Sequence, residues 1–148
     1  MFFKKKIKMG AVTTLIDKDI TIRGDTTYSG GLRLDGKIFG NLTLLRDERN
    51  TILIMGEGSK VTGNIIVETA IINGEIRGNI KCTDYLELNA NAIIIGDIEY
   101  GVLEIHAGAK VNGNLSLIKK EVVRKRPKEK PILKQNVMKK VFGEKDVN

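Results

Sequence analysis

The chain has few of the residues on which active sites are usually built. Among its 148 residues there are one Cys, one His and no Trp. A single Cys excludes an intrachain disulfide, and one Cys with one His leaves no Cys/His zinc cluster within a chain. The phosphate-binding pattern Gly-x-x-x-x-Gly-Lys-Ser/Thr is absent as well. The sequence therefore predicts no catalytic residues, no cofactor, no metal site and no small-molecule substrate.

Long apolar runs are also missing. No stretch of about 18 apolar residues is present to span a membrane, and the basic start of the chain lacks the apolar segment of a secretion signal. A lone Cys fits a reducing compartment. We therefore expect a cytoplasmic protein. Cys82 falls at an inward position of a predicted strand and is interpreted as a small core residue rather than a reactive thiol.

Charge is unevenly distributed along the chain. Residues 1–10 hold four Lys and no acid, residues 11–118 have a net charge of −4, and residues 119–148 have a net charge of +7. A mildly acidic body thus carries two basic ends. Attraction to anionic membranes or phosphate-rich partners is expected at those ends.

A short repeat occupies the body of the chain. Successive repeat glycines are 23, 15, 18 and 17 residues apart, which is within the range of coiled repeat architectures. Pairs of apolar residues at alternate positions run in step with them. The repeats are Gly40-Asn41-Leu42, Gly63-Asn64-Ile65, Gly78-Asn79-Ile80, Gly96-Asp97-Ile98 and Gly113-Asn114-Leu115, and the pairs are Ile20/Ile22, Leu32/Leu34, Ile52/Ile54, Ala70/Ile72, Leu86/Leu88 and Leu103/Ile105.

Alternation with period two between the repeats predicts short strands without intervening helices. Strands that recur every 15 to 23 residues indicate a chain that coils so that each turn pairs with the next. The side of the strand that faces inward must change at certain points, because a one-residue shift turns a strand inside out. We place these changes at Glu57-Gly58-Ser59, Glu68-Thr69 and Glu99-Tyr100-Gly101.

The repeat residues themselves have an expected place in such a coil. Glycine is unfavourable in the middle of a strand but suits a corner where φ is positive. Gly40, Gly78 and Gly113 are therefore predicted at corners. The Asn or Asp after each glycine would stack from coil to coil and form a polar ladder.

The predicted organisation has three parts. Residues 1–16 form a flexible N-terminal tail, residues 17–118 an all-β, single-domain parallel β-helix of about six coils, and residues 119–148 a basic disordered tail. Both prolines lie in that last segment. After Pro131, apolar residues at helical spacing predict one short amphipathic helix that needs a partner surface.

Residues 17–118 resemble a bactofilin domain. The resemblance rests on ITIRGDTTYSGGLRLDGKIFGNL from Ile20, followed by VTGNIIV, INGEIRGNIKC, LELNANAIIIGDI and LEIHAGAKVNGNL. It implies a right-handed β-helix that polymerises end to end into cytoskeletal filaments without nucleotide. It also implies a membrane-tethering start, here Met1, Phe2, Phe3, Lys4, Lys5 and Lys6. The 23-residue step departs from the pattern, and 46–50 is expected to bulge from its coil as a charged loop.

The ends of the coil give an independent reason to expect polymerisation. A β-helix leaves unpaired N–H and C=O groups on its first and last coils, and solenoids usually cover them with polar repeats. No covering repeat is evident before Ile20 or after Leu117. We therefore expect the end coils to bind other copies of the chain, through Ile20, Ile22, Leu103, Ile105, Leu115 and Leu117.

The expected function is thus a filament-forming scaffold at the inner face of the cell membrane, organising cell shape or the envelope, with the C-terminal tail reaching protein partners. One alternative is an acyltransferase of the hexapeptide-repeat type, which is also a β-helix; its strict six-residue phase and catalytic His are not matched by variable repeats and His106 alone. The other is nucleic-acid binding by the basic tail, which lacks aromatic residues for base stacking.

Overall fold

The computed structural model describes residues 12–45 and 51–119. Within these two ranges all regular secondary structure is β-strand and there is no helix, which confirms the all-β prediction. The predicted charged loop at 46–50, residues 1–11 of the N-terminal tail and residues 120–148 of the C-terminal tail lie outside the described residues.

Fifteen strands follow one another in the described part of the chain. They are β1 (Val12–Ile16), β2 (Thr21–Arg23), β3 (Thr26–Tyr28), β4 (Gly31–Leu34), β5 (Lys37–Phe39), β6 (Leu42–Leu44), β7 (Ile52–Met55), β8 (Lys60–Thr62), β9 (Ile65–Ile72), β10 (Glu75–Arg77), β11 (Ile80–Leu88), β12 (Ile93–Ile95), β13 (Ile98–Ile105), β14 (Lys110–Asn112) and β15 (Leu115–Leu117).

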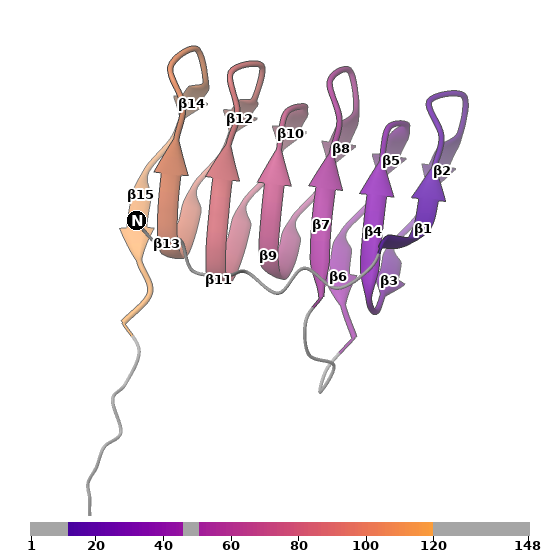
Figure 1. The fold of residues 1–148 in the computed structure, drawn as a ribbon, viewed down its shortest axis with the longest axis horizontal. Helices are drawn as coiled ribbons and strands as arrows, with labels where there is room; N and C mark the ends of the chain where they lie inside the picture. Colours follow the sequence, from indigo (N-terminus) through magenta and orange to yellow (C-terminus); the bar gives the residue numbers. More distant parts are fainter. Residues whose placement is uncertain (1–11, 46–50, 120–148) are drawn as a thin grey trace, which may run out of the picture. The chain divides into compact units, whose positions relative to one another are not determined.

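All strand pairs are parallel, and they stack into three columns (Figure 1). The second column contains only short strands, in the order β2, β5, β8, β10, β12 and β14. The long strands β9, β11 and β13 bend at a corner, so each contributes its first half to the third column and its second half to the first column. The result is a parallel β-solenoid of about six turns, as predicted.

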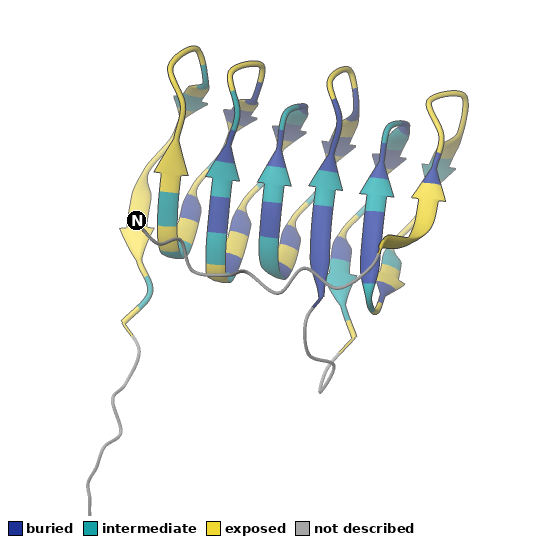
Figure 2. Ribbon diagram, in the orientation of Figure 1, coloured by how far each residue is buried: buried dark blue, intermediate teal, exposed yellow. Residues whose placement is uncertain are grey.

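Aliphatic side chains of successive coils lie directly above one another and fill the bore. In the first column Leu34 aligns with Met55, Met55 with Ile72, and Ile72 with Leu88, and all four are at most 1% exposed. Figure 2 shows buried positions along the middle strands and mainly exposed ones on the strands at both ends. Burial of these stacked aliphatic layers, worth roughly 25 cal/mol per Å² of apolar surface, stabilises the coil.

One predicted alignment is wrong. The stacked residues of β7 are Leu53 and Met55, which align with Leu32 and Leu34, and not the pair Ile52/Ile54. All four residues of β7 are apolar, so alternation of apolar and polar residues cannot indicate which of them face inward. The change of inward side therefore falls between β6 and β7 instead of at Glu57-Gly58-Ser59.

The other two predicted changes of inward side are confirmed in position. They occur at Glu68-Thr69 and at 99–101, but they are bends inside the continuous strands β9 and β13 rather than loops. β11 accommodates the same corner with a register shift between Cys82 and Tyr85, where it has one residue more than β9. An extra residue bends a strand locally, as β-bulges do.

The first coil begins before the predicted boundary at residue 17. Thr14 and Ile16 of β1 align with Leu32 and Leu34, so β1 occupies the level below β4. The pair Ile20/Ile22 does not belong to this column, because Ile22 aligns with Ile38 in the second column. Two consecutive threonines in β1 break the apolar alternation, which is why the repeat pattern does not extend to this strand.

The repeat glycines form a column of their own at one corner. Gly40, Gly63, Gly78 and Gly96 have φ between 149° and 151°, a region that disfavours other residues. A Cβ added to any of them would overlap the carbonyl oxygen of the glycine one coil earlier. The corner therefore requires glycine both for its dihedral angle and for the close approach of consecutive coils.

The predicted polar ladder is present beside these glycines. The side-chain oxygen of each Asn or Asp accepts a hydrogen bond from the backbone N–H of its counterpart in the next coil, at 2.9–3.0 Å. The series runs through Asp25, Asn41, Asn64, Asn79, Asp97 and Asn114. The same atom of each side chain makes the bond, so either Asn or Asp satisfies the position.

Replacement of Asn79 by Ala is expected to lower the free energy of unfolding by about 1 kcal/mol, the usual net value of one hydrogen bond. The reason is that the backbone N–H of Asp97 loses its acceptor. Asn79→Asp keeps an oxygen at the same place and is the matched control. Urea unfolding monitored by circular dichroism measures both variants, and equal losses in the two would show that the ladder bond contributes nothing.

Candidate functional site

The C-terminal end of the solenoid exposes an unpaired strand edge. β15 pairs with residues 98–100 of β13, so within the described residues Val102–Ile105 pairs only with β11. Ile105, Leu115 and Leu117 are 45%, 44% and 61% exposed, although they continue the inward series of the buried coils. Leu103 packs partly against the core. This end therefore combines open backbone groups with apolar side chains.

The N-terminal end has the same character. β1, β2 and β3 each pair on one side only among the described residues. Val12 and Ile20 are 46% and 43% exposed, while Ile22 packs partly against the core. No strand or helix in the described ranges covers either end, and Figure 2 shows many exposed positions at both.

All six residues predicted to mediate polymerisation lie in the first or the sixth coil. Ile20 and Ile22 belong to the first coil, and Leu103, Ile105, Leu115 and Leu117 to the sixth. The polar ladder ends at the same places, with Asp25 at its start and Asn114 at its finish. The sequence did not indicate Val12, because β1 was not expected to be a strand.

The residues predicted to bind a membrane, Met1 to Lys6, lie outside the described part of the chain. Among the described residues, no helix is long and apolar enough to cross a bilayer.

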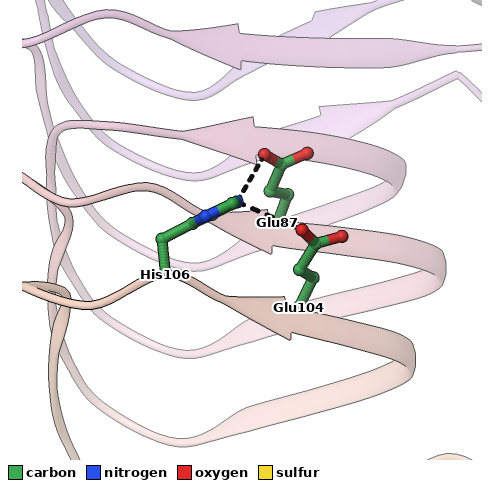
Figure 3. A group of neighbouring side chains, drawn as sticks. All are labelled: Glu87, Glu104 and His106. Carbon is green, nitrogen blue, oxygen red and sulfur yellow. Dashed lines mark hydrogen bonds and ion pairs between the residues drawn. The ribbon is translucent and has the colours of Figure 1, made fainter.

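A second candidate site lies on the outer face of the first column. Glu87 of β11 and Glu104 of β13 are directly opposite each other in the parallel register. His106 follows β13, and its Nε2 lies 2.9 Å from Glu87 Oε2 and 3.2 Å from Glu104 Oε2 (Figure 3). Both glutamates alternate with inward-facing residues of their strands and point outward. The sequence prediction of no metal site considered only Cys and His as ligands, and therefore did not include a group of one His and two Glu.

Tyr85 stands beside this group. Its hydroxyl lies 2.5 Å from Glu104 Oε1 and 3.2 Å from Glu87 Oε1, and it donates to one carboxylate at a time. Desolvation, followed by the hydrogen bond to Glu104 and the charge of Glu87, raises the pKa of the Tyr85 hydroxyl. The hydroxyl therefore stays protonated and acts as a donor that orients the carboxylates.

Cys82 is a core residue in the structure, as expected. Its side chain is fully buried, and its thiol lies within hydrogen-bond distance of the carbonyl oxygens of Glu68 and Tyr85. Burial, with a smaller contribution from Asp84, raises the pKa of the thiol to about 12. A thiol that stays protonated is a poor nucleophile.

The chain is similar to known proteins over most of its length. A family model named Bactofilin, described as polymer-forming cytoskeletal, matches residues 14–116. The chain is 32% identical over 104 residues to Bactofilin BacP of Myxococcus xanthus, a match that covers 70% of the chain and 41% of BacP. It is 29% identical over 108 residues to Bactofilin BacO of the same organism, covering 73% of the chain and 82% of BacO. No solved structure matches the chain significantly.

Proposed function

Because the chain belongs to the bactofilin family of polymer-forming cytoskeletal proteins, we propose that it assembles end to end into filaments, without nucleotide, and serves as a scaffold. The observation that carries this proposal is the pair of open solenoid ends. Within the residues that the structure describes, each end has unpaired strand edges beside exposed apolar side chains. Such edges are templates for pairing with another chain.

Two kinds of interaction support assembly at these ends. Stacking another copy on the sixth coil removes Ile105, Leu115 and Leu117 from water, which is favourable in proportion to the apolar area buried. It also supplies hydrogen-bond partners to backbone groups of Val102–Ile105. Apolar burial and backbone hydrogen bonding also hold consecutive coils together within the chain.

The direct test is negative-stain electron microscopy of purified full-length protein in buffer without nucleotide. Filaments one solenoid wide at micromolar protein concentration are the expected result. Protein that remains monomeric by light scattering and shows no filaments under these conditions would refute end-to-end assembly.

We further propose that the basic start of the chain tethers the filament to the inner face of the cell membrane. Phe2 and Phe3 enter the interface, and each of the four lysines among residues 1–10 adds about 1 kcal/mol near anionic lipid. One copy binds weakly, whereas a filament displays many copies and gains through multivalency.

Deletion of residues 2–6 is expected to release the protein from anionic vesicles. In a co-sedimentation assay with vesicles containing phosphatidylserine, the full-length chain should pellet with lipid and the deletion variant should stay in the supernatant. Filaments also pellet without lipid. Flotation of the vesicles on a sucrose gradient therefore distinguishes lipid-bound protein from filaments that sediment by themselves. Equal flotation of both proteins would show that this segment is not the tether.

The C-terminal residues 119–148 are proposed to hold protein partners of the scaffold. This proposal is supported by the net charge of +7 of the segment and by the apolar residues at helical spacing after Pro131. In this proposal the filament concentrates partners along the membrane for cell shape or envelope organisation and performs no catalysis itself.

A further inference from the structure

The strand register places two carboxylates side by side, and the nearest basic residue in their row, Arg33, lies three strands away from Glu87. Along the outer face of the first column, Glu104 aligns with Glu87, Glu87 with Ile71, and Ile71 with Ile54. Like charges directly opposite each other in a sheet are destabilising. Among the described residues, His106 is the one basic side chain with a nitrogen within 4 Å of a carboxylate oxygen of these two glutamates.

The three side chains nevertheless converge on one point. Glu87, Glu104 and His106 each offer a ligand atom, and these atoms all lie within 4.8 Å of one another. For bonds of about 2.0–2.1 Å to a tetrahedral metal, ligand atoms are separated by roughly 3.3 Å. The separations of His106 Nε2 from the two carboxylate oxygens, 2.9 and 3.2 Å, are close to that value.

From this geometry we propose that Glu87, Glu104 and His106 bind a divalent transition-metal ion, with Zn²⁺ as the best fit. Imidazole nitrogen with carboxylate oxygen is a ligand set that zinc accepts, whereas magnesium and calcium favour sites made of oxygen ligands. The ion neutralises the two adjacent carboxylates, and three protein ligands leave a fourth position for water.

Tyr85 acts on the metal through Glu104. Its hydroxyl donates to Oε1 of Glu104, which leaves Oε2, the oxygen nearest His106, free to bind the ion. Hydrogen bonds of this kind orient metal ligands, and their loss typically weakens binding 10- to 100-fold. Tyr85 is thus a positioning residue of the site and not a ligand.

The ligand side chains are accessible on the outer face, although Glu104 belongs to the strand edge at the C-terminal end of the solenoid. These side chains point outward from the first column (Figure 3), and those of His106 and Glu104 are 44% and 48% exposed. The apolar residues proposed to bind another copy continue the inward series instead. Metal binding can therefore be measured whether or not the chain forms filaments.

The test uses untagged full-length protein, in which His106 is the sole His. Equilibrium dialysis against buffered Zn²⁺ should give one ion per chain, and X-ray absorption at the zinc edge should show one imidazole nitrogen with oxygen ligands. His106→Gln and Glu104→Gln should each weaken binding at least about 100-fold, and Tyr85→Phe about tenfold.

The matched control is Glu99→Gln, on the same strand and exposed but outside the group. It should bind Zn²⁺ as the wild type does, and far-UV circular dichroism confirms that every variant remains folded. The proposal is overturned if the wild type binds no ion at micromolar Zn²⁺, or if His106→Gln binds as tightly as Glu99→Gln. In that case the three residues form only a hydrogen-bonded cluster together with Tyr85.

Discussion

Replacement of Ile105 by Lys is expected to abolish filaments at concentrations at which the wild type assembles. Ile105 continues the inward series of Leu88 and is 45% exposed at the open end. In a stacked filament its position becomes covered, and an ammonium group there would lose its water without gaining a partner. A penalty of about 2.7 kcal/mol already raises the critical concentration roughly 100-fold. Sedimentation across a concentration series measures this value.

The matched control for this variant is Val102→Lys. Val102 lies on the same strand, is 56% exposed and aligns with Tyr85 on the outer face. A lysine there stays in water in the filament, so the critical concentration should remain near that of the wild type. If both variants assemble normally, the end face is not the polymerisation surface; if both fail, the lateral face participates instead.

The second large effect is expected for Gly78→Ala, which should lower the free energy of unfolding by roughly 3–5 kcal/mol. The φ of Gly78 is 150°, and its new Cβ would overlap the carbonyl oxygen of Gly63. Strain at such a φ costs about 1–3 kcal/mol, and the rigid backbone clash adds to it. A loss of this size corresponds to a decrease in Tm of roughly 12–20 °C, since 1 kcal/mol shifts Tm by about 4 °C in a domain near 100 residues.

Gly24 separates the two causes. It belongs to the same corner column and has a φ of 131°, but a Cβ there would meet nothing within 4 Å because it lies in the first coil. Gly24→Ala should therefore show only the strain, about 1–3 kcal/mol. Both variants are measured by thermal unfolding in the Ile105→Lys background, so that assembly does not contribute. Equal losses of stability in the two variants would mean that the contact between the added Cβ and the previous coil contributes nothing to the effect of Gly78→Ala.

Much of the coil could be predicted because its constraints repeat. Gly40, Gly63, Gly78 and Gly96 mark one corner, and the Asn or Asp after each marks the ladder. The same physical requirement returns at every turn, so each copy supports the interpretation of the others. The prediction failed where that repetition is interrupted: the threonines of β1 conceal the first strand, and four consecutive apolar residues in β7 conceal its inward side.

The two candidate sites also differ in whether the sequence repeat marks their residues. The position of the end residues in the first and sixth coils could be predicted, because these are the first and last repeats in the sequence. The Glu87, Glu104 and His106 group could not, since it depends on the register between β11 and β13 across 17 to 19 residues of chain. No local pattern marks two glutamates and a histidine as neighbours when coils of unequal length separate them.

The amino-acid sequence by itself therefore determined the β-solenoid, its corner glycines, its polar ladder and the aliphatic filling of its bore. These features arise from backbone geometry and side-chain size, which act within one coil and recur in the next. Only the tertiary structure decided which residues of adjacent coils lie opposite one another. Register depends on the length of every turn and on bends such as the one between Cys82 and Tyr85. It is this register that brings the two carboxylates and the imidazole together.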